Sequence, residues 1–227
     1  NYYNIDGGDT VITECTFSNP FSYGVGVKQK HSGGLRLTNN KILGGSIGYL
    51  LAYEAVAGDA GPASTGILLI CNNSIENQSS TGISFTRVSG SNPWYYTLVG
   101  YNELAGMPSG IVSDSSAFLQ QINVSDNTIQ LAGSGTPLGI ALVGANQVLV
   151  DNNSLKANGG TTPIGVYLAS CIDAKVGKNL YNGFAVGDAV KLITPGANNS
   201  VDYDEQAGTA VSSTSSWAAY GSCFRSP

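Results

Sequence analysis

The stretch VLVDNNSLKANGG (148–160) recurs along the chain with small changes. LRLTNNKILGG (35–45), LLICNNSIENQ (68–78) and INVSDNTIQLAG (122–133) share its aliphatic lead-in, its asparagine and the aliphatic residue two positions later. Aligned on the asparagine, the chain contains seven copies, with key positions Cys15, Asn40, Asn73, Asn102, Asn127, Asn153 and Asn179. The key positions are 25, 33, 29, 25, 26 and 26 residues apart, and a period of this length is typical of a solenoid.

Each copy predicts short strands, because aliphatic residues alternate with other types around the key position. Two positions after it lies a hydrophobic residue: Phe17, Ile42, Ile75, Leu104, Ile129 and Leu155 in the first six copies. In the last copy the pattern shifts by one to Leu180. A further strand headed by glycine follows in six copies, at Gly24, Gly48, Gly82, Gly110, Gly139 and Gly165. With no helical stretch between the strands, the sequence predicts an all-β parallel β-helix of about seven coils, stacked about 4.8 Å apart.

The repeated asparagine predicts an internal ladder along the axis of the solenoid. A side-chain amide carries both donors and an acceptor, so stacked asparagines can hydrogen bond from coil to coil. The ladder would satisfy buried polar groups that otherwise cost about 1–3 kcal/mol each. We expect Asn40, Asn73, Asn102, Asn127, Asn153 and Asn179 to form it, with Cys15 breaking it in the first coil.

The composition limits the function classes. The net charge is −5 and only 11% of residues are charged, so a basic surface for nucleic acid is not expected. No apolar run reaches membrane-spanning length and no signal peptide is recognisable, so we expect no membrane insertion. The four cysteines (Cys15, Cys71, Cys171 and Cys223) lack a CxxC pairing and are interpreted as buried free thiols rather than disulfides. We expect no metal and no cofactor.

The repeat resembles the right-handed parallel β-helix, or pectin-lyase-like, superfamily over about residues 8–195. The resemblance implies that the chain binds or processes a polysaccharide. The polygalacturonase-like signatures Asn-Thr-Asp, Asp-Asp, Gly-His-Gly and Arg-Ile-Lys are absent, and no aspartate cluster of the pectate-lyase type is seen. Low charge and abundant Ser, Thr, Gly and Asn favour the bacteriophage tailspike branch, whose members share no catalytic motif.

The tailspike interpretation implies a homotrimeric receptor-binding protein of the virion tail that binds, and is expected to cleave, a host cell-surface polysaccharide. Residues 1–195 would form the β-helix, and residues 196–227 a C-terminal cap or oligomerisation segment. Two alternatives stay open: a secreted pectin-lyase-like hydrolase or lyase, and a non-catalytic β-helical adhesin. Whether the chain is an enzyme is left undecided, with an inverting glycoside hydrolase as the form that catalysis would take.

The longer coils predict where a site would lie. Their extra residues fall in AYEAVAGDAGPASTG (52–66) and TRVSGSNPWYYT (86–97). Insertions into a solenoid leave its core intact and commonly build the binding face. The outward ends of the glycine-headed strands also gather charge at this end of the molecule. We expect the two insertions to wall a patch formed by Lys28, Lys30, His31, Tyr53, Glu54, Arg87 and Asp114.

Glycoside hydrolysis commonly uses two carboxylates. Glu54 is the candidate acid and Asp114 the candidate base, at comparable positions about 10 Å apart in the backbone, with Asp59 as a substitute. Arg87 would orient the sugar, and Lys28 and His31 would line the rim. The stacking candidates are Tyr53, Trp94, Tyr95 and Tyr96.

Each of these assignments has a structural alternative. The aromatic run from Trp94 could instead pack its loop or fill a subunit interface, and Glu54 with Arg87 could form a surface ion pair of little energetic value. Lys28, Lys30 and His31 could be a solvated rim.

Overall fold

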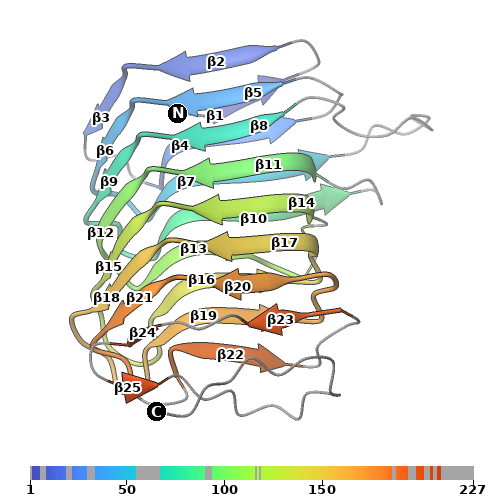
Figure 1. The fold of residues 1–227 in the computed structure, drawn as a ribbon. Coiled ribbons are helices and arrows are strands. Elements are labelled where there is room, and N and C mark those ends of the chain that lie inside the picture. The colour runs from blue at the N-terminus through green and yellow to red at the C-terminus, as the bar shows by residue number, and fades with distance from the viewer. Residues whose placement is uncertain are drawn as a thin grey trace.

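Alternating aliphatic side chains cause each repeat to fold into three short strands, and the strands of successive repeats stack into a parallel β-solenoid in the computed structural model (Figure 1). Figure 1 places the N-terminal strands at the top of the stack and β22 to β25 at the bottom. The structure describes residues 2–5, 9–18, 22–29, 34–54, 67–89, 94–115, 117, 119–185, 188–193, 198–201, 205–206 and 209–210.

The strands belong to three sheets, here named A, B and C. Sheet A holds β1 (Tyr2–Ile5), β4 (Tyr23–Gln29), β7 (Ile47–Glu54), β10 (Thr81–Ser89), β13 (Ser109–Ser113), β16 (Leu138–Val143), β19 (Ile164–Ala169) and β22 (Val190–Ile193). Sheet B holds β2 (Thr10–Thr13), β5 (Leu35–Thr38), β8 (Leu68–Cys71), β11 (Trp94–Gly100), β14 (Leu119–Ser125), β17 (Asn146–Asp151), β20 (Lys175–Gly177) and β23 (Ser200–Val201). Sheet C holds β3 (Thr16–Ser18), β6 (Lys41–Leu43), β9 (Ser74–Glu76), β12 (Glu103–Met107), β15 (Thr128–Leu131), β18 (Ser154–Ala157), β21 (Leu180–Asn182), β24 (Glu205–Gln206) and β25 (Thr209–Ala210).

Each coil runs through sheets B, C and A in that order, so the strand after the key asparagine belongs to sheet C and the glycine-headed strand to sheet A. Coils are numbered here from β2-β3-β4 to β20-β21-β22. The chain makes six full turns between Cys15 and Asn179, as the repeat predicted. Beyond these coils, β23 and β24 add parallel strands to sheets B and C, and β25 pairs antiparallel with β24. No helix in the described part of the chain is long and apolar enough to cross a membrane.

The predicted core positions are confirmed. The inward residues of sheet A are fully buried, among them Val25, Tyr49, Phe85 and Leu142. The aliphatics two residues after the ladder asparagines are buried as well, namely Ile42, Ile75, Leu104, Ile129 and Leu155.

The predicted shift at the seventh coil is wrong. Tyr181, not Leu180, pairs with Leu155 and is 0% exposed, whereas Leu180 is 50% exposed. The reason is the two-residue period of a strand, which turns Leu180 outward once Asn179 is held in the ladder. The aromatic ring of Tyr181 fills the aliphatic position and packs edge-to-face with Phe184, with ring centroids 6.0 Å apart.

The glycine at the second position of six sheet A strands, β4, β7, β10, β13, β16 and β19, is explained by close packing. A Cβ added to Gly139 would lie 2.4 Å from both the carbonyl oxygen of Gly165 and Cδ2 of Leu155. At Gly110 the corresponding distances are 2.5 Å to the carbonyl oxygen of Gly139 and 2.8 Å to Cγ2 of Ile129. The glycines therefore make room both for the backbone and for the core aliphatic of the next coil.

The asparagine ladder is present. Asn73 donates from its backbone N–H to Oδ1 of Asn102 at 3.0 Å and from Nδ2 to the same oxygen at 2.9 Å. Its Nδ2 also donates to the carbonyl oxygen of Leu37 at 2.8 Å. The backbone N–H of each described ladder residue from Asn40 to Asn153 donates to the next asparagine's Oδ1, and that of Cys15 donates to Asn40.

A tyrosine hydroxyl is inserted into this ladder. Asn40 Nδ2 donates to the hydroxyl of Tyr49 at 3.0 Å, and that hydroxyl donates to Asn73 Oδ1 at 2.8 Å. Burial raises the pKa of Tyr49 above its usual range, and the hydrogen bond from Asn40 lowers it by a smaller amount.

The residue before each key position has a left-handed backbone. Its φ lies between 55° and 57° at Glu14, Asn39, Asn72, Tyr101, Asp126, Asn152 and Lys178. Asparagine and aspartate tolerate this conformation better than other non-glycine residues, which explains the paired residues of the NN and DN motifs.

Two of the described cysteines match the sequence interpretation and one does not. Cys71 and Cys171 are buried free thiols, and burial raises the pKa of each. Cys15 is free but exposed, because it takes the ladder position at the first coil, where its thiol donates to the carbonyl oxygen of Thr13. Cys223 lies outside the described residues.

Candidate functional site

The two sequence insertions lie at one corner of the solenoid, between a sheet A strand and the next sheet B strand. Residues 55–67 connect β7 to β8, and residues 90–93 connect β10 to β11. These strands belong to adjacent coils, so both insertions lie at the corner that the coil lengths predicted. We call it the A–B corner.

Most of the predicted site residues belong to this corner. Lys28 lies in β4, Tyr53 and Glu54 end β7, Arg87 lies near the end of β10, and Asp114 directly follows β13. On the other side of the corner, β11 begins with Trp94, Tyr95 and Tyr96.

The structure describes some of the predicted site residues only in part, and others not at all. Lys30, His31 and Asp59 lie outside the described residues. For Lys28, Tyr53, Glu54, Trp94 and Tyr95 the structure describes the backbone but not the side chain.

The strand register separates the two candidate carboxylates. Glu54 pairs with Ser89, whereas Ser113 pairs with Phe85 and the N–H of Asp114 donates to the carbonyl oxygen of Phe85. Asp114 therefore lies level with Thr86, two residues before the row of Glu54. From the strand rise and the coil spacing, the two backbones are roughly 12 Å apart rather than 10 Å.

Asp114 already accepts hydrogen bonds with both carboxylate oxygens. Oδ2 accepts from the hydroxyl of Thr86 at 2.5 Å, and Oδ1 accepts from the N–H of Ala117 at 2.8 Å. This arrangement closes the turn after β13 and links it to the preceding coil. A carboxylate whose two oxygens already accept hydrogen bonds suits a turn anchor or an acceptor for a sugar hydroxyl better than the predicted role of a general base, which must take up a proton.

Arg87 and Tyr96 are the other candidates whose side chains are described. Arg87 is half-buried and pairs in register with Tyr53 of the preceding coil. Tyr96 is 54% exposed and has a left-handed backbone, with φ at 50°. An exposed aromatic ring held on a strand provides a rigid face for stacking.

Sequence reasoning missed the outer face of sheet B next to this corner. On β8, β11, β14 and β17 the inward residues are buried, and the alternate positions face outward. We call two columns of outward positions, six and four residues before the key asparagines, the sheet B strip; they are Ile67, Leu69, Tyr96, Leu98, Gln121, Asn123, Gln147 and Leu149. The repeat alignment could have shown this surface, because the positions four and six residues before these key asparagines hold no charged residue in four consecutive copies.

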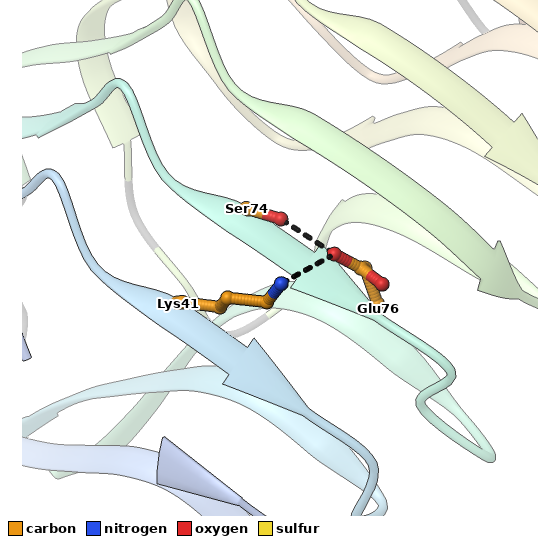
Figure 2. Close-up of polar contacts among 3 residues, drawn as sticks. All are labelled: Lys41, Ser74 and Glu76. Atoms are coloured by element: carbon orange, nitrogen blue, oxygen red, sulfur yellow. Dashed lines mark hydrogen bonds and ion pairs between the residues drawn. The ribbon is translucent and has the colours of Figure 1, made fainter. Parts of the chain in front are cut away.

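Sheet C presents charges on its outer face in a different arrangement. Lys41 Nζ lies 3.7 Å from Glu76 Oε1, which also accepts a hydrogen bond from the hydroxyl of Ser74 at 2.8 Å (Figure 2). Figure 2 shows that β6 supplies the lysine and β9 the other two side chains, so the contact links adjacent coils. An exposed pair of this kind contributes little stability, and we interpret it as a surface contact.

The described residues provide no group of three His, Cys, Asp or Glu side chains that could hold a metal ion. Comparison of the chain with family models, curated proteins and solved structures found no match. The candidate function is therefore argued from the chain's own residues.

Proposed function

We propose that this β-solenoid is a receptor-binding protein of the tailspike type that binds a cell-surface polysaccharide at the A–B corner and the adjoining face of sheet B. The observation that carries the proposal is the exposed ring of Tyr96 at the corner where the insertions of two adjacent coils lie. In this proposal the protein stands in the virion tail as a homotrimer.

A polysaccharide suits this surface for physical reasons. Sugar rings have apolar C–H faces that pack on aromatic rings, and hydroxyl groups that exchange hydrogen bonds with amides. The corner and the strip offer both partners, in Tyr96 and in Gln121, Asn123 and Gln147. A stack of parallel strands also repeats the same outward positions along its axis, which fits a polymeric ligand.

Binding without cleavage is the form of the proposal that the described geometry supports best. Asp114 uses both oxygens within the protein and lies off the row of Glu54. If cleavage does take place, Glu54 would be the acid and Asp114 or Asp59 the base. A secreted polysaccharide hydrolase or lyase is then the alternative class.

The test is a panel of bacterial surface polysaccharides, scored for binding by calorimetry and for cleavage by reducing-sugar release. Saturable binding without release supports the proposal, release indicates a hydrolase, and an ultraviolet-absorbing unsaturated product indicates a lyase. If the wild-type chain binds no member of the panel, the proposal is overturned.

A paired substitution tests the location of the site. Tyr96→Ala should weaken binding by about tenfold, the equivalent of losing one good stacking contact. Tyr101→Ala is the matched control, since Tyr101 is also exposed, has a left-handed backbone and lies just after the other end of β11. Equal effects of the two substitutions would place the ligand elsewhere.

A further inference from the structure

The sheet B strip carries no charged side chain at any of its outward positions, from the third coil to the sixth. In the same two columns, charges lie one coil beyond each end: Arg36 pairs with Leu69, and Lys175 pairs with Leu149. The strip is therefore an uncharged surface bounded by charged residues, in a chain whose other faces carry ion pairs.

Three side chains of the strip are held in a conformation that their residue types disfavour. The first outward column turns left-handed at Tyr96, Gln121 and Gln147, with φ values of 50°, 57° and 51°. The next two coils have Asp173 and Asn198 at this place, also left-handed, and these are the types that tolerate the conformation. The fold alone would favour Asn or Asp at all five positions.

Strain of this kind persists where a side chain is needed for another purpose, and it clusters at ligand-binding sites. Tyr96, Gln121 and Gln147 lie on consecutive coils, so the larger side chains form a continuous column rather than scattered exceptions. Their shared feature is a long or aromatic side chain that reaches outward.

Three side-chain amide oxygens at this surface have no hydrogen-bond donor among the described residues. Oε1 of Gln121, Oδ1 of Asn123 and Oδ1 of neighbouring Asn146 are buried and accept no hydrogen bond from any described residue. Asn123 pairs in register with Leu98 on one side and Leu149 on the other, and neither of these paired side chains can donate a hydrogen bond. The missing donors must come from outside the sheet, after the amide turns outward.

We propose that the sheet B strip binds an uncharged segment of glycan, which rests on the proposed function and specifies its ligand class. Sugar hydroxyls donate to the carboxamides of Gln121, Asn123 and Gln147, and the C–H face of a ring packs against Tyr96 and Leu98. A carboxylated or sulfated sugar would lose hydration here without meeting a cation. A second copy of the chain fits less well, because a dry interface would leave the amide oxygens unsatisfied.

The decisive variant is the double substitution Gln121→Asn with Gln147→Asn. Asparagine relieves the left-handed strain, so the melting temperature should rise by a few degrees, while the shortened side chains should weaken binding of a neutral polysaccharide about tenfold. Lys178→Asn is the control, because Lys178 is also left-handed, with φ at 55°, and lies outside the strip. It should raise the melting temperature and leave binding unchanged.

Binding is measured by calorimetry against a neutral β-glucan, a neutral galactomannan, neutral bacterial O-polysaccharides and a polyuronate, each at low and high salt. Saturable, salt-insensitive binding of a neutral polymer that the double variant weakens supports the inference. Binding of the polyuronate alone, with affinity that falls as salt rises, overturns the inference while the proposed function stands. No binding to any polymer overturns the proposed function as well.

Two further results would overturn the inference. One is a double variant that binds the neutral polymer as tightly as the wild-type chain. The other is a double variant that lowers the mass found by light scattering while glycan binding stays the same, because the strip would then be an interface between copies. Tyr96→Ala serves as a second probe, since it removes the packing face without touching the amides.

Discussion

The hydroxyl of Tyr49 bridges the side chains of Asn40 and Asn73, whereas Asn73 and Asn102 hydrogen bond to each other directly. It accepts from Asn40 Nδ2 and donates to Asn73 Oδ1 inside the core. Tyr49→Phe keeps the ring but removes both hydrogen bonds, and should lower the free energy of unfolding by about 1–3 kcal/mol. Urea denaturation checks this, with Tyr167→Phe, on the half-buried outer face of sheet A, as a control that should change little.

The same residue predicts a pH dependence. Burial raises the pKa of Tyr49 above its ordinary value of 10.0, so the neutral hydroxyl is favoured in the folded state. Above that value the unfolded chain loses the proton while the folded chain keeps it, and the free energy of unfolding falls as the pH rises. The fall should be shallower in Tyr49→Phe than in the wild-type chain. If the free energy of unfolding falls equally with pH in the two proteins, the Tyr49 hydroxyl is not held neutral by burial in the folded state.

The element that depends most on one residue type is the sheet A strand, because the glycine at its second position faces the next coil at very short range. A Cβ at position 110 would lie 2.5 Å from the carbonyl oxygen of Gly139, and backbone cannot move aside as a flexible side chain can. Gly110→Ala should therefore lower the free energy of unfolding by about 1–3 kcal/mol, the usual range for overpacking. Gly100→Ala is the control.

At Gly100 the added Cβ would come no closer than 3.2 Å to another residue's backbone, so a smaller loss is expected. Thermal unfolding of both variants decides the comparison. If Gly110→Ala unfolds at the wild-type temperature, close packing does not explain the repeated glycine of the sheet A strands.

At the scale of the whole molecule, the ends of the stack and its outer faces decide what the solenoid can associate with. Strand edges left unpaired are usually covered, by a cap or by a partner. The described C-terminal end turns back through β25, which pairs antiparallel with β24. The cap or oligomerisation role of residues 196–227 stays a prediction.

The tailspike proposal predicts a homotrimer with the solenoids side by side. Multi-angle light scattering should give the mass of three chains, independent of concentration over the measured range. A stable monomer would count against the tailspike class and leave the polysaccharide-binding surface to be judged by its own experiments.

Local patterns in the sequence were enough to predict the coils. The asparagine, the aliphatic two residues later and the glycine of sheet A each depend on contacts that recur in most coils, so the repeat itself records them. Asn127, Ile129 and Gly139 were therefore assigned to the ladder, the core and the strand start from spacing alone, and their predicted places are confirmed.

The candidate site depended on tertiary structure instead. At the A–B corner, strand pairing between coils decides which outward side chains lie side by side. The connections of these coils differ in length, so spacing along the chain does not reveal that pairing. Asp114 therefore lies level with Thr86 rather than with Glu54, and Tyr181 rather than Leu180 enters the core. Left-handed turns and unsatisfied amides arise from three-dimensional packing, so the repeat alignment contains the positions of the sheet B strip but only the structure shows the features that make it a candidate site.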